Sequence, residues 1–371
     1  MTPRVLLVSP VPPPIGGISR WTEKMIDVFA NSTEIELCVF DTAPRRRRSL
    51  TLTTRQRIRE GLWRGLSEIS RFWWCVLHTR PAVVHLNTSG SLALARDCAM
   101  LTILRVMRIP AVLHIRYGRV PEVAQKRGWE WILTKLGARM ATLIVTLDKE
   151  TQRVLGSQGA STITIPNFVD TAIPSRPISE RSRNFLFVGW VVTSKGILDL
   201  LEAWRLARPQ GWRLDIVGPI GDEATIRESV SSEIPGVTFL GETDKEHVAE
   251  MMQDCGIFVL PSHTEGFPNV ISEAMAAGAP IIATSVGAIP DMLDGMAGVV
   301  IAPHDPIQLG AAMSRLASDP GEREHLRRAA RARCVAMYGV STVVTQYREA
   351  WVVLARHGSR SEAQHSGLSV R

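Results

Sequence analysis

The segment Pro261–Leu293 reads PSHTEGFPNVISEAMAAGAPIIATSVGAIPDML, and its order of apolar and turn residues decides the fold of this part of the chain. It follows a short apolar run, Ile257–Leu260, which predicts a buried strand. Pro268 and Asn269 then open a predicted helix and Gly278 ends it, because proline is typical of the first helical turn and glycine of the position after the last. A strand that runs through a loop into a helix is the repeating unit of doubly wound parallel sheets.

Two glutamates lie on either side of the predicted helix start. The backbone N–H groups and the positive dipole at such a start favour a phosphate. Glu273, one turn inside, is placed to accept hydrogen bonds from a ribose diol, and Glu265, on the loop, is placed to face a sugar. The alternative is that Glu273 complements the helix dipole and Glu265 is a solvated loop residue.

Short runs rich in Val, Ile and Leu alternate with longer segments of helical periodicity along the whole chain, which predicts parallel strands joined by crossover helices. In the first half the predicted strands are Val5–Ser9, Glu36–Phe40, Ala82–Leu86, Ala111–Ile115, Thr142–Leu147 and Thr162–Ile165. In the second half they are Phe185–Gly189, Arg213–Val217, Val237–Leu240, Ile257–Leu260, Pro280–Thr284 and Gly298–Ile301. The runs are continuously apolar, so helices should cover both faces of each sheet. We predict an α/β protein with two Rossmann-like domains.

The length of 371 residues agrees with two domains. We expect an N-terminal domain over residues 1–170, a proline-bearing polar linker over 171–184, and a C-terminal domain over 185–340. Helical spacing of apolar residues then predicts a terminal helix over 341–357, and the polar stretch 358–371 predicts a disordered tail.

Composition excludes several classes of protein. With 45% hydrophobic and 21% charged residues the chain is neither disordered nor fibrous. The five cysteines are far apart and never form a CxxC pair, which argues against a disulfide framework and a zinc cage and favours a reducing cytoplasm. No run approaches the ~20 apolar residues of a spanning helix, and the first residues lack a signal-peptide core. Basic residues outnumber acidic ones two to one in residues 1–160, whereas acidic residues are in excess in the remainder.

The string EGFPNVISE followed by AMAAGAPIIAT closely resembles the two-glutamate signature of retaining GT-B glycosyltransferases, with the best match to family 4, the glycosyl transferases group 1. Further segments match that family in the same order along the chain: PPPIGGISRW, VVHLN, AVLHIRYG, IPNFVD, FVGWVVTSKGILDLLEAW and VTFLG. The resemblance implies two Rossmann-like domains that face a central cleft, with the C-terminal helix crossing back to the N-terminal domain. It also implies a nucleotide-sugar donor.

The resemblance assigns site residues. The implied catalytic residues are His114, which would orient the donor sugar, and Glu265. The implied donor-binding residues are Gly16, Gly17, Lys195, Gly266, Phe267, Pro268, Asn269 and Glu273. From position alone, a histidine such as His114 at the end of a strand is more often a packed structural residue. Lys195, placed against a helix dipole, suggests an anionic partner, and the alternative is a solvated lysine.

Two positions modify this assignment. The family commonly has Gly-Arg where this chain has Gly189-Trp190, and that arginine normally pairs with the donor diphosphate. Its loss leaves Lys195, the helix start at Asn269 and a basic residue of the N-terminal domain to neutralise the leaving group, and the tryptophan could instead pack in the core. Asn167 and Asp170 resemble the turn that closes the first domain of the family, where a purely structural role is equally open.

The arginine-rich stretch from Arg45 continues into a predicted helix, residues 55–78. The predicted inner stripe is Ile58, Leu62, Leu66, Ile69, Trp73 and Leu77, flanked by Trp63, Phe72 and Trp74, and the basic residues are Arg45–Arg48, Arg57, Arg59, Arg64 and Arg71. A basic amphipathic helix with aromatic residues can lie on an anionic membrane. A crossover helix with a solvated basic face explains the same pattern, and the two readings are compatible.

We therefore expect an enzyme that transfers a sugar, with retention, from a UDP- or GDP-sugar to a hydroxyl of a lipid-linked or growing polysaccharide acceptor. Because no DxD-like site faces the diphosphate, no metal and no other cofactor is expected. We expect a cytoplasmic protein, in contact with an anionic membrane through its basic N-terminal domain, and no nucleic-acid partner. The alternatives are a nucleotide-sugar epimerase or phosphorylase of the same architecture, and a non-catalytic basic membrane-binding module.

Overall fold

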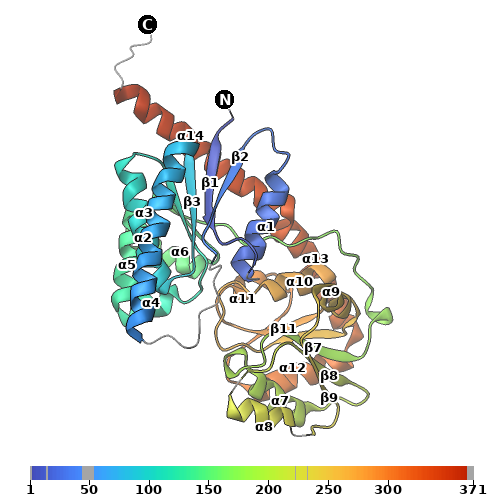
Figure 1. The fold of residues 1–371 in the computed structure, drawn as a ribbon. Coiled ribbons are helices and arrows are strands. Elements are labelled where there is room, and N and C mark those ends of the chain that lie inside the picture. The colour runs from blue at the N-terminus through green and yellow to red at the C-terminus, as the bar shows by residue number, and fades with distance from the viewer. Residues whose placement is uncertain (1, 14–15, 44–53, 222, 232, 366–371) are drawn as a thin grey trace. The chain divides into compact units, whose positions relative to one another are not determined.

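A computed structural model describes residues 2–13, 16–43, 54–221, 223–231 and 233–365, with side chains left out for a few residues inside the helices. The chain divides into two compact units. The first unit comprises the chain up to Ile165 together with the residues from Thr345 onward, and the second unit is Pro166–Val344. Both are α/β units in which helices flank one sheet (Figure 1).

The sheet of the first unit is six-stranded and parallel, in the order β2-β1-β3-β4-β5-β6. Its strands are β1 (Arg4–Ser9), β2 (Glu36–Asp41), β3 (Val83–Thr88), β4 (Ala111–Ile115), β5 (Leu143–Thr146) and β6 (Thr162–Thr164). Its helices are α1 (Gly17–Phe29), α2 (Thr54–Thr79), α3 (Ser91–Val106), α4 (Val120–Lys126), α5 (Trp129–Met140), α6 (Lys149–Gly156) and most of α14 (Val340–His365).

Alternate residues of the central strands of the first unit pack on opposite faces of the sheet. Leu86 on β3 and Leu113 on β4 belong to a core that includes Phe72 of α2. Their neighbours His85 and His114 instead contact aromatic side chains from α1 and α14. The C-terminal helix therefore packs on the sheet of the first unit, as the resemblance implied.

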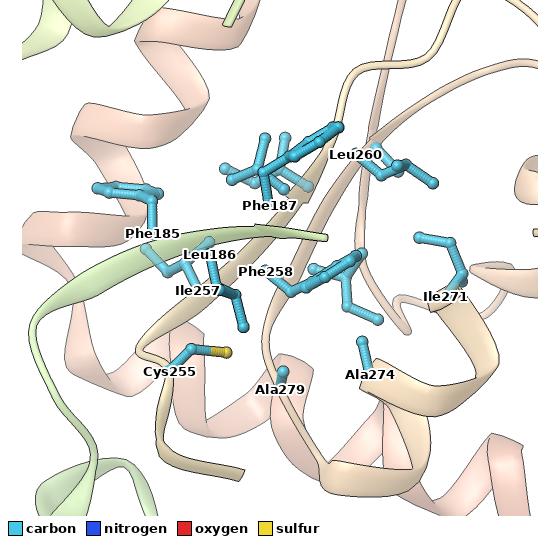
Figure 2. Packing of buried hydrophobic residues seen from close by; sticks show 14 of the residues in the cluster. Phe185, Leu186, Phe187, Cys255, Ile257, Phe258, Leu260, Ile271, Ala274 and Ala279 are labelled. Carbon is cyan, nitrogen blue, oxygen red and sulfur yellow. The ribbon is translucent and has the colours of Figure 1, made fainter. Parts of the chain in front are cut away.

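The second unit repeats the plan, with a parallel sheet in the order β12-β11-β10-β7-β8-β9. Its strands are β7 (Asn184–Val188), β8 (Arg213–Val217), β9 (Val237–Gly241), β10 (Ile257–Leu260), β11 (Ile281–Thr284) and β12 (Val299–Ile301). Its helices are α7 (Ile197–Ala207), α8 (Ala224–Ser231), α9 (Lys245–Asp254), α10 (Asn269–Ala277), α11 (Ile289–Met292), α12 (Pro306–Ser318) and α13 (Pro320–Tyr338), with short 3-10 turns η1 (Ile178–Glu180) and η2 (Thr193–Lys195). Figure 2 shows side chains of β7 and β10 packed with Ile271 and Ala274 of α10. The labelled strand residues are fully buried: Phe185, Leu186, Phe187, Ile257, Phe258 and Leu260.

All twelve predicted strands are present, each within two residues of its predicted bounds. The α/β fold with two parallel sheets that the sequence predicts is therefore confirmed. Order along each sheet matters for function, because ligands of such sheets bind at the carboxyl ends of the strands where the strand order reverses. That reversal lies between β1 and β3 in the first unit and between β7 and β10 in the second.

Two predicted boundaries differ from the structure. Residues 171–184 are not a free linker, since Arg331 donates a hydrogen bond to the Thr171 carbonyl (2.6 Å) and Arg181 donates one to the Ala277 carbonyl (2.7 Å). These contacts attach the segment to the second unit, which begins at Pro166. The C-terminal helix continues to His365, into the stretch predicted as disordered, and residues 366–371 lie outside the described residues.

The stripe predicted for α2 is wrong at Trp73 and Leu77, whereas Ile69 of the same stripe is partly buried. Phe72 and Val76 are buried against the sheet, whereas Trp73, Trp74 and Leu77 are exposed, at 42%, 63% and 45%. Apolar residues occupy nearly every position from 72 to 77, so periodicity alone does not select the inward face. Arg45–Arg48 and the side chains of the predicted residues up to Leu66 lie outside the described part of the chain.

Candidate functional site

The loops that follow β7 and β10 meet where the strand order of the second sheet reverses. Lys195 comes from the turn after β7 and Glu265 from the loop after β10, and their Nζ and Oε1 atoms lie 2.6 Å apart. The Ser262 hydroxyl donates to the same carboxylate oxygen at 2.7 Å. The Glu265 side chain is only 9% exposed, which excludes the reading that it is a solvated loop residue. The anionic partner expected for Lys195 is, in this structure, Glu265.

Close backbone packing fixes these two loops against each other. Gly196 has φ +69°, and a Cβ atom there would lie 1.9 Å from the Pro261 carbonyl oxygen, so this turn requires glycine. The His263 amide donates to the Ser194 carbonyl at 2.9 Å. Lys195 is therefore held beside the loop that carries Glu265 by contacts on both sides of it.

Helix α10 begins next to this pair, as predicted. Asn269 is its first residue, and no side chain caps its N-terminus. Gly278 ends the helix in the left-handed conformation at φ +67°. Glu273 is exposed one turn into the helix, and the uncapped helix start offers backbone donors to an anion.

The remaining residues implied by the two-glutamate segment differ in their accessibility. The Gly266 carbonyl accepts a hydrogen bond from the Ala288 amide at 2.8 Å. The Phe267 ring is partly buried and packs edge-on against Tyr338, with centroids 5.7 Å apart, while Pro268 is buried. The side chains of Phe267 and Pro268 thus anchor the loop.

The position after Gly189 is open to solvent. Trp190 is 60% exposed, so the reading in which it packs in the core is wrong. It stands in the turn between β7 and Lys195, where the family resemblance would place an arginine. Lys195 therefore supplies the positive charge of this turn.

The turn predicted at Asn167 and Asp170 reaches the start of α10. The Asn167 amide donates to the Asn269 side-chain oxygen at 2.8 Å, and the Asp170 carboxylate accepts from the Ala172 amide at 2.8 Å. Asp170 thus closes a local turn, which supports its structural reading. Asn167 orients the first residue of α10.

In the first unit, the predicted catalytic His114 is fully buried. Its Nδ1 lies 3.1 Å from Nε2 of His85, and Nδ1 of His85 lies 3.0 Å from the indole nitrogen of Trp351 on α14. Burial, together with nearby Arg116, lowers the pKa of His85 to about 3 and that of His114 well below its usual value, so both rings are neutral. In this structure His114 lies in the packed layer between the sheet and α14.

These contacts fix the tautomer of both histidines. An indole nitrogen can only donate, so Nδ1 of His85 accepts and its proton resides on Nε2. That proton is donated to Nδ1 of His114, whose own proton then resides on Nε2. Trp351, more than two hundred residues further along the chain, thereby determines which nitrogen of His114 can accept a hydrogen bond.

The glycine pair of the first unit lies at the start of α1. Gly16 caps the helix in an extended conformation, and its amide donates to the Ser19 hydroxyl at 2.8 Å. Gly16 and Gly17 are both exposed, at the carboxyl side of β1 where the sheet order reverses. Pro14 and Ile15 of the same predicted loop lie outside the described residues.

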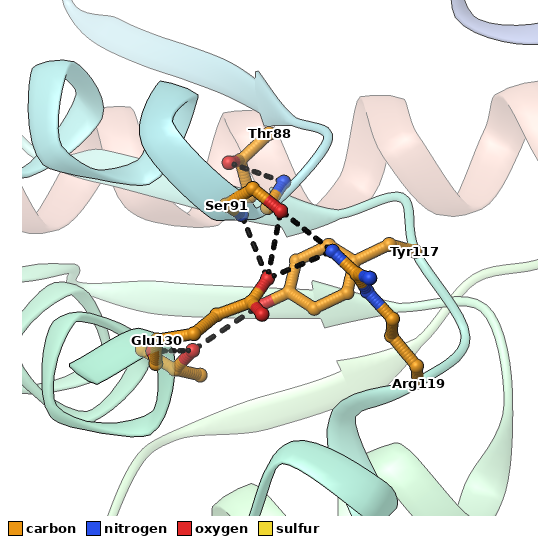
Figure 3. Close-up of polar contacts among 7 residues, drawn as sticks. Thr88, Ser91, Tyr117, Arg119 and Glu130 are labelled. Atoms are coloured by element: carbon orange, nitrogen blue, oxygen red, sulfur yellow. Dashed lines mark hydrogen bonds and ion pairs between the residues drawn. The ribbon is translucent and has the colours of Figure 1, made fainter. Parts of the chain in front are cut away.

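A polar network joins the loops that follow β3 and β4 (Figure 3). The Glu130 carboxylate accepts from the Ser91 amide at 2.8 Å and pairs with Arg119 at 3.1 Å. The Tyr117 hydroxyl lies 3.1 Å from the Thr134 hydroxyl. These contacts fix the segment between β4 and α4, including Arg116, which sequence reasoning did not single out.

Asp199, His263 and His304 are described residues that could share a metal ion, since their ligand atoms lie within 4.8 Å of one another. The His263 Nε2 and Asp199 Oδ2 atoms are 2.8 Å apart, and the two imidazole rings lie 3.7 Å apart between centroids. Two imidazoles and a carboxylate suit a transition metal such as Zn²⁺. Their separation along the chain, with no short motif, hides the cluster from sequence reasoning.

In the described part of the chain, no helix is long and apolar enough to cross a membrane.

Comparison with known proteins agrees with the fold. The family described as glycosyl transferases group 1 matches residues 182–319. Glycogen synthase of Mycobacterium tuberculosis is 26% identical over 293 residues, which cover 76% of this chain and 70% of that protein. Among solved structures, sucrose-phosphate synthase from Thermosynechococcus elongatus superposes with a TM-score of 0.74 at 21% identity, covering 95% of this chain and 99% of that one.

A second solved structure was determined with a bound nucleotide sugar. HepE of Anabaena, in complex with UDP-glucose, superposes with a TM-score of 0.69 at 17% identity, and the match covers 94% of this chain and 99% of that one. The parallel sheets of the two units, the match to group 1 and these likenesses together identify the chain as a glycosyltransferase of the GT-B fold.

Proposed function

We propose that this chain is a retaining, family 4 glycosyltransferase that transfers a sugar from a UDP- or GDP-sugar to a hydroxyl of a lipid-linked or growing polysaccharide. The observation that carries the proposal is the pairing of Lys195 with Glu265 at the sheet reversal of the second unit, beside the uncapped start of α10. The complex of HepE with UDP-glucose supports a nucleotide-sugar donor for a chain of this fold.

The arrangement suits departure of a nucleoside diphosphate. Negative charge develops on the diphosphate as the bond to the sugar breaks, and fixed positive groups stabilise it without reorganisation. The Lys195 ammonium, which pairs with Glu265, would turn to the diphosphate, and the amides at the start of α10 would supply further donors. Glu265 would then be free to accept a hydrogen bond from a sugar hydroxyl.

Replacing Glu273 with alanine is expected to weaken nucleotide binding, because the variant loses the carboxylate proposed to hold the ribose diol. Calorimetric titration of the full chain with UDP, GDP and ADP should show saturable binding of one nucleotide to the wild type. We expect at least tenfold weaker binding to Glu273→Ala, the typical loss for a hydrogen bond to a charged group. The exposed Glu250, on α9, gives a matched control as Glu250→Ala.

The same titrations should give the same nucleotide affinity in the presence of EDTA. The rate of sugar transfer should also be unchanged by EDTA, since we propose a metal-independent reaction. Binding that disappears in EDTA and returns with a divalent ion would overturn that part of the proposal. A wild type that binds none of the three nucleotides, or a Glu273→Ala variant that binds as the wild type does, would overturn the assigned donor site.

We also propose that the exposed face of α2 contacts an anionic membrane. Trp73, Trp74 and Leu77 are exposed beside Arg71, a combination of aromatic, apolar and basic groups that suits a lipid surface. Sedimentation with phosphatidylglycerol vesicles should retain the wild type and release Trp73→Ser/Trp74→Ser. Neutral phosphatidylcholine vesicles serve as the control for charge. Equal retention of variant and wild type would contradict the proposal.

A further inference from the structure

Arg116 is a cation on the carboxyl side of the first sheet whose surroundings, as far as the structure describes them, are aromatic and neutral. It follows β4 directly, and its amide donates to the Thr88 carbonyl at 3.0 Å. Among the residues that the structure describes, no carboxylate pairs with its guanidinium. The group instead lies over the Trp21 ring, 4.6 Å from the centroid, beside His114 and the Tyr347 hydroxyl. Burial lowers its pKa to about 10, which leaves it charged at neutral pH.

The nearest polar neighbour does not satisfy this guanidinium. Nη1 of Arg116 lies 3.4 Å from Nε2 of His114. The chain of hydrogen bonds from Trp351 through His85 places a proton on that nitrogen, so it cannot accept another from the guanidinium. The guanidinium therefore keeps donors available, and among the described residues the Tyr347 hydroxyl and the Trp21 ring are its favourable contacts.

The segment that carries Arg116 is held firmly at an edge where ligands of such sheets bind. The next residue, Tyr117, packs against Gly90, where an added Cβ would lie 2.9 Å from the tyrosine ring. The Glu130 network fixes the segment further (Figure 3). A partly buried charge costs free energy unless it is paired. A guanidinium held this rigidly is therefore suited to an anion-binding site.

We propose that Arg116 binds a phosphate group of a substrate at the carboxyl edge of β4. This inference rests on the proposed function, which supplies phosphate as the substrate anion. The planar guanidinium donates two parallel hydrogen bonds to phosphate oxygens, a match that lysine lacks. The phosphate belongs either to the sugar donor or to the acceptor, and the experiment below distinguishes these two sources.

The test compares Arg116→Met with Arg139→Met, which removes an exposed arginine from α5 in the same unit. Without ligand, Arg116→Met should melt at or above the wild-type temperature, because it removes an unpaired charge and its thioether can pack on Trp21. A structural arginine would give the opposite sign. Arg116→Lys keeps the charge but loses the planar group that donates two parallel hydrogen bonds. This variant should bind phosphate probes with intermediate affinity.

The probes are UDP and glucose 6-phosphate, titrated separately into the full chain. At least tenfold weaker binding of UDP to Arg116→Met assigns the phosphate to the donor, and the same loss for glucose 6-phosphate assigns it to the acceptor; either result supports the proposal. The proposal is overturned if Arg116→Met binds both probes as Arg139→Met does, or if its melting temperature falls. The proposed function is tested separately. It is overturned if the wild type binds no nucleotide, or if Glu273→Ala binds nucleotide as the wild type does.

Discussion

Lys195→Met should lower turnover by about 10²- to 10³-fold, the usual cost of removing one preorganised group that stabilises developing negative charge. Lys195 carries the positive charge of the turn after β7, because the neighbouring position holds the exposed Trp190. Methionine keeps the length of the side chain and removes only the ammonium. The measurement is turnover at saturating donor, with the nucleotide affinity determined in parallel.

A second effect of this substitution has to be separated from the first. Removing the ammonium leaves the carboxylate of Glu265, which is 9% exposed, with the Ser262 hydroxyl as its one remaining side-chain partner among the described residues. The fold therefore also loses stability. Lys195→Met/Glu265→Gln removes both charges and should recover thermal stability. It should not recover turnover, since the diphosphate still lacks its cation.

Arg205→Met is the control for loss of a positive charge, since Arg205 is exposed on α7 and pairs only loosely with Glu202 at 3.4 Å. It should keep wild-type turnover. Turnover of Lys195→Met within about threefold of the wild type would show that the leaving group is neutralised elsewhere.

The sequence predicts the framework of this fold well because its strands are fully buried. Runs such as Ile257–Leu260 consist of apolar, mostly branched residues bounded by turn residues, and a parallel sheet covered on both faces requires that pattern. The end of α10 at Gly278 is equally local, since the left-handed residue after a helix favours glycine. Such features depend on neighbours in the sequence, which a single chain shows directly.

What the sequence does not show depends on contacts between distant segments. The burial of His114 results from α14, which covers the same face of the sheet and brings Trp351 to His85. The isolation of Arg116 depends on which carboxylates the fold leaves away from it, and no motif records that. The outward position of Trp73 depends on how α2 rotates on its sheet, where two apolar faces compete.

Gly196→Ala should destabilise the second unit by more than about 4 kcal/mol, a loss reserved for severe clashes or strain. Two costs combine. A left-handed conformation costs an L-residue about 1–2 kcal/mol, and Gly196 has φ +69°. The larger cost is the contact of 1.9 Å between the new Cβ and the carbonyl oxygen of Pro261, a backbone atom that cannot turn aside as a side chain would.

Comparison with Gly295→Ala separates the cost of the clash from the cost of the left-handed conformation. Gly295 lies in the same unit with the same φ of +69°, but an added Cβ there meets nothing within 4 Å. The two variants therefore share the conformational cost and differ in the clash. Urea unfolding of the full chain, followed by tryptophan fluorescence, should place Gly196→Ala well below Gly295→Ala in stability. Equal losses of stability would show that the turn after β7 can move away from Pro261. The backbone would then not hold Lys195 beside Glu265, and the donor site would lose the rigid pairing that supports it.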